Sequence, residues 1–170
     1  MRRPQAFRLR KGRVSEQGRI YFITTCCVSR VPIFASPTLA RLLCRQLYQE
    51  DRSPLLGILA YVVMPDHVHV LPELTGRKDL STVVGRLKGR AAAAINSARH
   101  CHGAVWQEGF HDHALRTDES VARSASYPIQ NPVRAGLVTT ADDYAYWDTI
   151  WHDRSVVAGE RLRSARQERL

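Results

Sequence analysis

The stretch "LLGILAYVVMPDHVHVL", residues 55–71, decides the fold. Its first ten residues are mainly aliphatic and β-branched, which is typical of a buried strand. Pro65 and Asp66 then turn the chain, and "HVHVL" returns as the antiparallel neighbour. The stretch therefore predicts a β-hairpin whose second strand begins at His67.

Segments on either side of this hairpin supply further elements. Residues 19–28, "RIYFITTCCV", are rich in β-branched and aromatic residues and predict a strand. Residues 36–51 predict a helix with Ser36 as N-cap and Pro37 at the first helical position, and residues 79–99 predict a second helix. Each helix carries an apolar stripe. The stripes are Leu39, Leu42, Leu43 and Leu47 in the first helix, and Val83, Val84, Leu87, Ala91, Ala94 and Ile95 in the second.

The resulting order, β-α-β-β-α, lacks one strand of a ferredoxin-like fold. Either "AVWQ" (104–107) or "HDHALR" (111–116) can supply that strand. We therefore expect an α+β domain, a β-α-β-β-α-β antiparallel sheet with helices packed on one face. An N-cap signal at Thr117 and Asp118 and a stop at Pro132 place a third, C-terminal helix at about 118–130. The aromatic segment 144–151 is expected to pack against the sheet.

Composition narrows the choice of partners and compartment. The 170 residues predict one domain at 19–151, between a basic N-terminal arm at 1–18 and an Arg-rich tail at 152–170. The formal charge of +9 favours a polyanionic partner, with nucleic acid as the leading candidate. The sequence has no apolar run of membrane-spanning length and no signal peptide, so a cytoplasmic protein is expected. The four cysteines lack CxxC spacing, which indicates neither a zinc knuckle nor a disulfide framework.

His67 and His69 are the first candidate site. Side chains at positions i and i+2 of a strand project from the same face, so the two imidazoles can share one metal ion. Two histidines leave coordination positions open for a substrate oxygen and water, as a catalytic metal requires. Core histidines bonded to backbone groups would show the same spacing, so this pattern alone leaves both interpretations open.

Tyr127 is the second candidate, because its surroundings, "RSASYPIQN", are small and polar. A helical spacing of four places Arg123, Tyr127 and Asn131 on one face. The guanidinium can hold a phosphate, the phenol can attack it, and the amide oxygen can complete a metal's coordination. A half-buried tyrosine followed by a capping Asn would give the same pattern. Pro128 is expected to kink or end this helix.

Together these residues resemble the REP-associated tyrosine transposases, single-tyrosine members of the HUH endonucleases. The resemblance covers about residues 8–151, and its most specific feature is HVH followed about 60 residues later by a tyrosine motif. It implies that His67 and His69 are metal ligands, that Tyr127 is the nucleophile and that Asn131 is a third ligand. Pro128 departs from the family's pattern. The matching pieces are "LRKGRVSEQGRIYFITTC", "YVVMPDHVHVL", "VWQEGFHDHALR" and "YPIQNPVRAGLV".

The resemblance also implies an activity. We expect Mg²⁺- or Mn²⁺-dependent cleavage and strand transfer of single-stranded DNA at repetitive extragenic palindrome hairpins, through a 5′-phosphotyrosine. REP-associated members of the family can act as monomers, so a monomer is expected, with a dimer as the alternative. A histidine-triad nucleotide hydrolase is one alternative, although its third alternate position is occupied by Leu71 and it does not need Tyr127. The other alternative is a hairpin-binding protein without catalysis, which the presence of all the site residues disfavours.

Several cations are candidates for phosphate contacts, with ordinary surface charge as the alternative explanation. The second two-residue histidine pair, His111 and His113, is expected to be structural. Trp106 is expected in the core rather than stacked on a base. The candidate DNA-binding residues are Arg8, Arg10, Lys11 and Arg13 in the arm, Arg86, Lys88 and Arg90 in the second helix, and Arg123.

Overall fold

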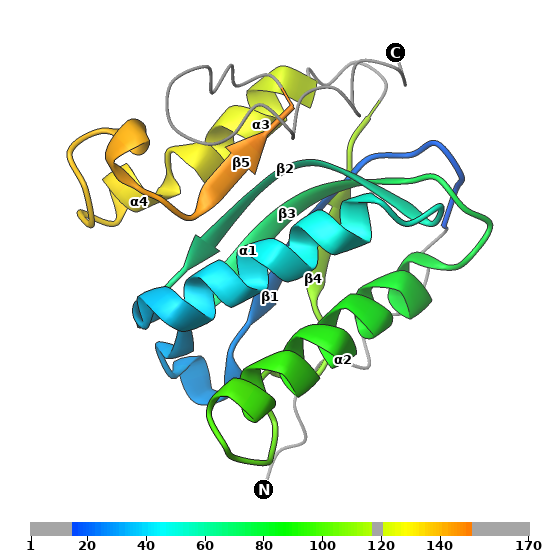
Figure 1. The fold of residues 1–170 in the computed structure, drawn as a ribbon. Coiled ribbons are helices and arrows are strands. Elements are labelled where there is room, and N and C mark those ends of the chain that lie inside the picture. The colour runs from blue at the N-terminus through cyan, green and yellow to red at the C-terminus, as the bar shows by residue number, and fades with distance from the viewer. Residues whose placement is uncertain (1–14, 117–120, 151–170) are drawn as a thin grey trace, which may run out of the picture.

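The predicted hairpin lies inside a five-stranded antiparallel sheet (Figure 1). The computed structural model describes residues 15–116 and 121–150 of the chain. Strand β2 (Leu56–Met64) pairs with β3 (His67–Leu74), with Met64 opposite His67 and Val62 opposite His69. Pro65 and Asp66 connect the two strands, so the hairpin prediction is confirmed.

The other strands extend the sheet on both sides of this hairpin. Strand β1 (Tyr21–Cys26) pairs with β3, and β4 (His111–Ala114) pairs with β1. A short strand β5 (Trp147–Thr149) pairs with β2. The strand order is therefore β4-β1-β3-β2-β5, which is the ferredoxin-like order with one strand added at the β2 edge.

Two long helices cover one face of the sheet (Figure 1). Helix α1 (Pro37–Asp51) and helix α2 (Leu80–Ala98) bury most of their predicted stripes, whereas Leu42 and Ala94 stay partly exposed. Val68 and Val70 of β3 belong to the same core as these helices. Because neighbouring residues of a strand point to opposite faces, His67 and His69 must point away from the two-helix layer.

A second, smaller layer packs on the opposite face. Helix α3 (Val121–Ile129) contacts β2 and β3, and helix α4 (Asn131–Arg134) follows it directly. Buried Ala125 of α3 packs with Ala60 and Leu71 of the sheet. This layer therefore lies on the histidine face and carries Tyr127. The shorter helical turns are η2 (Val28–Arg30), η3 (Ile33–Ala35) and η4 (Ala141–Asp143).

Three details differ from the sequence expectations or decide between them. The missing strand comes from "HDHA", while Trp106 forms only an isolated bridge with Cys27 and packs against the core. Helix α3 is described from Val121, because residues 117–120 lie outside the described part. The aromatic segment does more than pack on the sheet, since Trp147 begins strand β5. Three residues are too short a run for a strand pattern to stand out in the sequence.

The ends of the described chain bear on the predicted arm and tail. Residues 15–18 of the predicted arm are tied to the domain, because Ser15 Oγ accepts the Leu80 N–H and the Gly18 N–H is donated to the Leu74 carbonyl. Residues 1–14 and the tail at 151–170 lie outside the described residues. None of the helices that the structure describes is long and apolar enough to cross a membrane.

A buried ion pair joins the two long helices. Glu50 at the end of α1 is 3% exposed, and its Oε1 lies 2.6 Å from Arg90 Nη1 on α2. Arg86 Nε lies 3.9 Å from the other carboxylate oxygen. The carboxylate is buried, whereas both guanidinium groups are about half exposed, so the two partners of this ion pair are not equivalent.

This asymmetry predicts unequal costs of substitution. Arg90→Met leaves a buried carboxylate short of its main partner and should lower the free energy of unfolding by about 3 kcal/mol. Glu50→Gln leaves only half-exposed cations and should cost about 1 kcal/mol. Urea denaturation measures both, with Arg45→Met on the exposed side of α1 as the control. Equal costs for the Arg90 and Glu50 variants would contradict this account.

Candidate functional site

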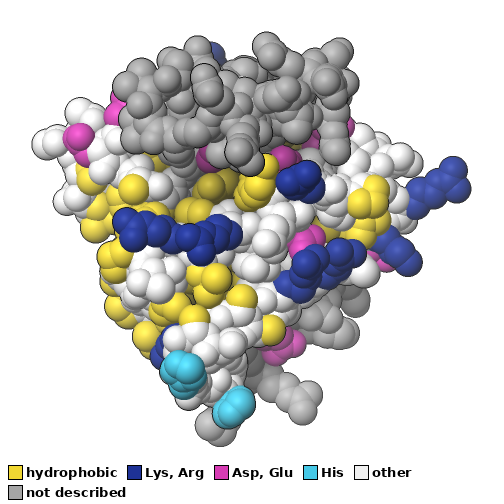
Figure 2. All heavy atoms as spheres, viewed as in Figure 1, with side chains coloured by type: hydrophobic (Ala, Val, Ile, Leu, Met, Phe, Trp, Pro, Cys, Tyr) yellow, Lys and Arg dark blue, Asp and Glu magenta, His cyan; other side chains and the backbone are white. Residues whose placement is uncertain are grey.

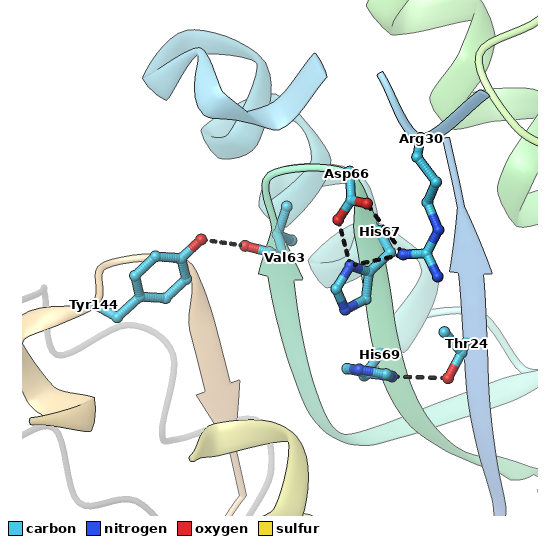
Figure 3. Close-up of polar contacts among 7 residues, drawn as sticks. All are labelled: Thr24, Arg30, Val63, Asp66, His67, His69 and Tyr144. Atoms are coloured by element: carbon cyan, nitrogen blue, oxygen red, sulfur yellow. Dashed lines mark hydrogen bonds and ion pairs between the residues drawn. The ribbon is translucent and has the colours of Figure 1, made fainter. Parts of the chain in front are cut away.

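His67 and His69 lie next to each other on β3, with ring centroids 4.8 Å apart and ring planes at 81° (Figure 3). His67 Nδ1 lies 2.6 Å from Asp66 Oδ1, and His69 Nδ1 lies 2.8 Å from the Thr24 hydroxyl. A carboxylate only accepts hydrogen bonds, so the His67 proton is on Nδ1. When His69 likewise donates from Nδ1 to Thr24, both Nε2 atoms keep a lone pair.

Burial and nearby positive charge keep His69 neutral. The side chain is 9% exposed, and burial, followed by electrostatic interactions with His67, Arg134 and Arg30, lowers its pKa to about 3. Burial alone would raise the pKa of Asp66, but its hydrogen bonds and ion pairs with His67 and Arg30 lower it overall. A neutral imidazole beside an ionised carboxylate is the form that metal binding requires.

Tyr127 lies on α3, across the aromatic ring of Phe22 from His69. The Phe22 centroid is 5.2 Å from the His69 ring and 5.8 Å from the Tyr127 ring, which it meets edge to face. Tyr127 is 56% exposed, although it is one of the largest side chains of the helix. Phe22 therefore supports both rings from the sheet, while the phenol stays open to solvent.

Arg134 lies over the face of the Tyr127 ring. Its guanidinium carbon lies 4.1 Å from the centroid of the Tyr127 ring, and Nη2 donates a 2.5 Å hydrogen bond to the Tyr127 carbonyl. Helix α3 ends two residues after Tyr127, since Pro128 and Pro132 both lack an N–H group. Arg134 therefore caps this helix end and holds the tyrosine ring by a cation–π contact.

Arg123 and Asn131 lie before and after Tyr127 in the chain, on α3 and α4. Arg123 is exposed on α3, one turn before Tyr127, and Asn131 is half-buried at the first position of α4. Pro128 marks the end of α3, so Tyr127 and Asn131 belong to two consecutive helices. The roles predicted for Arg123 and Asn131 stay predictions.

The candidate cations of α2 are engaged within the protein and lie on the two-helix layer. Arg86 and Arg90 face Glu50, and Lys88 Nζ donates to the carbonyls of Gln107 and Gly109. Burial lowers the pKa of Lys88. Figure 2 views this side of the molecule, where Lys and Arg side chains form small separate groups. A DNA contact by these three residues would lie across the sheet from the histidines; Arg8, Arg10, Lys11 and Arg13 lie outside the described residues.

The second histidine pair lies on strand β4. His111 is opposite Thr24 and His113 is opposite Phe22, so both point to the same face as His69. Both are exposed, and the structural role expected of them stays a prediction. In the part of the chain that the structure describes, no three His, Cys, Asp or Glu side chains gather in a way that could hold a metal.

The residues at this site fit a divalent metal that takes two ligands, His67 and His69, from strand β3. Each imidazole has its Nδ1 engaged by a neighbour, which is the usual way that metal-binding histidines are oriented. The remaining positions are open for oxygen donors, as in catalytic sites. Asn131 is the predicted third ligand.

Five residues that contribute to this site were not singled out by sequence reasoning: Phe22, Thr24, Arg30, Asp66 and Arg134. Phe22 and Thr24 alternate on a recognised strand, so their common face could have been read from the sequence, but their pairing with β3 could not. Asp66 was read only as a turn residue. Arg30 ends the turn η2 and Arg134 ends the four-residue helix α4, and both elements are too short to give a periodic signal in the sequence.

Comparison with known proteins agrees with the geometry of the site. The model of the IS200-like transposase family ("Transposase IS200 like") matches residues 17–127, so the chain belongs to this family of transposases. That segment holds the histidine pair and ends at Tyr127. The family assignment excludes the histidine-triad hydrolase alternative and identifies the chain as an enzyme of the transposase family.

Individual relatives point to one branch of this family. A putative REP-associated tyrosine transposase of Haemophilus influenzae is 25% identical over 142 residues, covering 76% of this chain and 79% of the relative. A REP-associated tyrosine transposase of Escherichia coli is 30% identical over 92 residues, covering 52% of each chain. A solved structure of a REP-associated tyrosine transposase bound to a REP hairpin has a TM-score of 0.65 at 24% identity, covering 79% of both chains, and it supports the fold.

The buried, neutral state of His69 predicts a pH-dependent stability. The unfolded chain protonates this histidine near pH 6.5, whereas the folded chain does so only near pH 3. The folded state therefore loses stability as the pH falls from 6.5 toward 3, by about 2 kcal/mol between pH 7 and pH 5. Urea denaturation in EDTA at both pH values should show this loss in the wild type.

His69→Gln serves as the comparison, because glutamine does not titrate. Its loss of stability over the same pH interval should be about 2 kcal/mol smaller than that of the wild type. Parallel pH profiles for the two proteins would mean that His69 is not the group responsible.

Proposed function

We propose that this protein cleaves and rejoins single-stranded DNA beside palindromic hairpins, with Tyr127 as the nucleophile and a divalent metal at His67 and His69. The proposal rests above all on the contact of the Phe22 ring with both the His69 ring and the Tyr127 ring. That contact brings an exposed phenol and two metal-competent imidazoles to one face of the sheet. Transposase chemistry by a tyrosine requires this combination.

The proposed reaction conserves the energy of the phosphodiester. The phenol oxygen of Tyr127 attacks phosphorus, a new P–O bond forms, and the bond from phosphorus to the 3′ oxygen breaks. The phenol gives up its proton to solvent and the departing 3′ oxygen gains one, leaving a 5′-phosphotyrosine and a free 3′-hydroxyl. Attack by a 3′-hydroxyl on the phosphotyrosine reverses the step, so rejoining needs no nucleotide cofactor.

Protein groups around Tyr127 orient the phenol for this attack. Phe22 supports the ring edge, and Arg134 holds the ring face while capping the helix at the Tyr127 carbonyl. Holding a nucleophile in one orientation lowers the entropic cost of reaching the transition state. Both contacts leave the hydroxyl end free to meet a phosphate, which agrees with its 56% exposure.

A Mg²⁺ or Mn²⁺ ion held by His67 and His69, with Asn131 as the proposed third ligand, would stabilise the negative charge that builds on the phosphate oxygens. Asp66 and Thr24 would fix the tautomers and orientations of the two imidazoles.

Hairpin DNA is the proposed substrate because of the relatives. The two curated relatives are REP-associated transposases, and the solved relative is bound to a REP hairpin. The chain's formal charge of +9 suits a polyanionic ligand. A monomer is the proposed form, with a dimer as the alternative.

The nucleophile is tested by trapping a covalent adduct. Wild-type protein incubated with a palindromic single-stranded oligonucleotide and Mn²⁺ should give an adduct on a denaturing gel, and Tyr127→Phe should give none. Tyr48 is another exposed tyrosine, but it lies on α1, so Tyr48→Phe is the matched control and should behave as the wild type. An undiminished adduct in Tyr127→Phe, or no adduct with wild type across a panel of hairpins, would sink the mechanism.

The proposed metal site is tested by substituting Thr24, whose hydroxyl is hydrogen-bonded to His69. Thr24→Val removes the hydroxyl that orients His69 with almost no change in shape, and it should weaken Mn²⁺ binding by about 10- to 100-fold. The measurement is calorimetric titration of Mn²⁺ into Tyr127→Phe protein saturated with hairpin DNA, which prevents cleavage.

Thr25→Val is the control, because Thr25 points to the opposite face. Its buried hydroxyl has no hydrogen-bond partner among the described residues, so the substitution should leave Mn²⁺ binding unchanged and should not destabilise the fold. Equal Mn²⁺ affinities for the Thr24 and Thr25 variants would remove Thr24 from the site.

A further inference from the structure

The loop after β1 holds two consecutive residues in a strained conformation. Ser29 has φ of 51° and Arg30 has φ of 55°, and neither is a glycine. The left-handed region costs an L-amino acid about 1–2 kcal/mol per residue, and such conformations persist where surrounding structure enforces them, often at functional sites. This loop connects β1 to α1 beside the histidine pair.

Hydrogen bonds from neighbouring segments enforce the loop conformation. The N–H of Cys27 donates to the Asp66 carbonyl at 2.8 Å, and the N–H of Phe34 donates to the Pro65 carbonyl at 2.9 Å. Both ends of the loop are thereby tied to the turn that starts the histidine strand. The position of Arg30 relative to His67 is therefore fixed by the backbone.

The strained loop aims the Arg30 side chain at the histidine pair. Its Nη1 lies 3.1 Å from Asp66 Oδ2 and 3.5 Å from His67 Nδ1 (Figure 3). His67 Nδ1 already donates to Asp66, so the guanidinium and the imidazole are two donors held side by side. A guanidinium has five N–H donors, and the Asp66 contact uses Nη1, so an anion at this point would accept hydrogen bonds from the other donors.

The ion pair with Asp66 does not account for this arrangement. The Arg30 side chain is 56% exposed, and an exposed ion pair contributes at most about 1 kcal/mol. The conformational free energy of two left-handed residues is larger than the stabilisation that this ion pair contributes. Arg30 is also absent from the cations expected from the sequence to contact DNA, and the proposed function as stated above gives it no role.

We propose that Arg30 binds a nonbridging oxygen of the DNA phosphate that sits at His67 and His69. This inference rests on the proposed function and adds a phosphate-binding residue to it. Arg30 approaches the site from the β1 side, while Arg134 lies on the Tyr127 side, so guanidinium groups flank the place where the phosphate reacts. Their fixed positive charge would stabilise the charge that develops on the phosphate.

The test pairs a protein substitution with a change in the DNA. The ligand is the hairpin oligonucleotide that forms the adduct with wild type, carrying a neutral methylphosphonate at one phosphate at a time across the cleavage junction. Binding is measured in EDTA, so that no metal or cleavage contributes. In the wild type, the methylphosphonate at the reacting phosphate should weaken binding about 10-fold, the loss of one charge-assisted contact.

In Arg30→Gln the same methylphosphonate should weaken binding less than about 2-fold, since its partner is already gone. Arg41 is an exposed residue of α1, on the face of the sheet opposite the histidines. Arg41→Gln therefore removes an equal charge far from the site and should keep the full wild-type effect. Arg30→Gly also relieves the left-handed strain, so it should lose the methylphosphonate effect while its Tm is no lower than that of the wild type.

The outcomes separate this inference from the function on which it rests. An adduct with wild type, together with a full methylphosphonate effect in Arg30→Gln, overturns the role of Arg30 and leaves the proposed function standing. A lower Tm in both Arg30 variants with the methylphosphonate effect intact shows a structural role and also overturns it. Failure of wild type to form any adduct overturns the proposed function and this inference together.

Discussion

The alternation of side chains along strand β3 is the constraint on which the rest of the structure depends. Val68 and Val70 pack into the core under helices α1 and α2, and this burial fixes the register of the strand. His67 and His69 must then face the other side, where, in the described part of the chain, helix α3 of the smaller layer packs on β2 and β3. A slip by one residue would put two valines at the site and two imidazoles in the core.

The turn before His67 connects the fold to the site. Its backbone carbonyls at Pro65 and Asp66 receive hydrogen bonds from the β1–α1 loop, and the Asp66 side chain contacts both His67 and Arg30. A single two-residue turn therefore sets the hairpin register, orients one imidazole and holds an arginine in place. Ser29 and Arg30, two of the three non-glycine residues with positive φ in the described chain, lie in the loop that this turn anchors.

The sequence predicted those parts of the structure that have a periodic or capping signal. The β2–β3 hairpin, both long helices and the ferredoxin-like order follow from apolar spacing, Pro37 and the Pro65-Asp66 turn. Strand β5 was missed because Trp147–Thr149 is stabilised as a strand by pairing with β2, which is a tertiary effect. The same holds at the site, where alternation placed His67 and His69 together, but Phe22, Arg30 and Arg134 join them only through folding.

The charges around the histidines raise a physical conflict that the proposed substrate resolves. Arg30 and Arg134 help to keep His69 neutral, and so free for a metal, yet the same cations repel a divalent ion. The Asp66 carboxylate offsets part of this repulsion while holding the His67 proton on Nδ1. In the proposed complex, a DNA phosphate would offset the remainder, because it would bring negative charge close to the guanidinium groups and the metal. In the proposed reaction, DNA and metal therefore stabilise each other's binding, and a site without DNA holds its metal weakly.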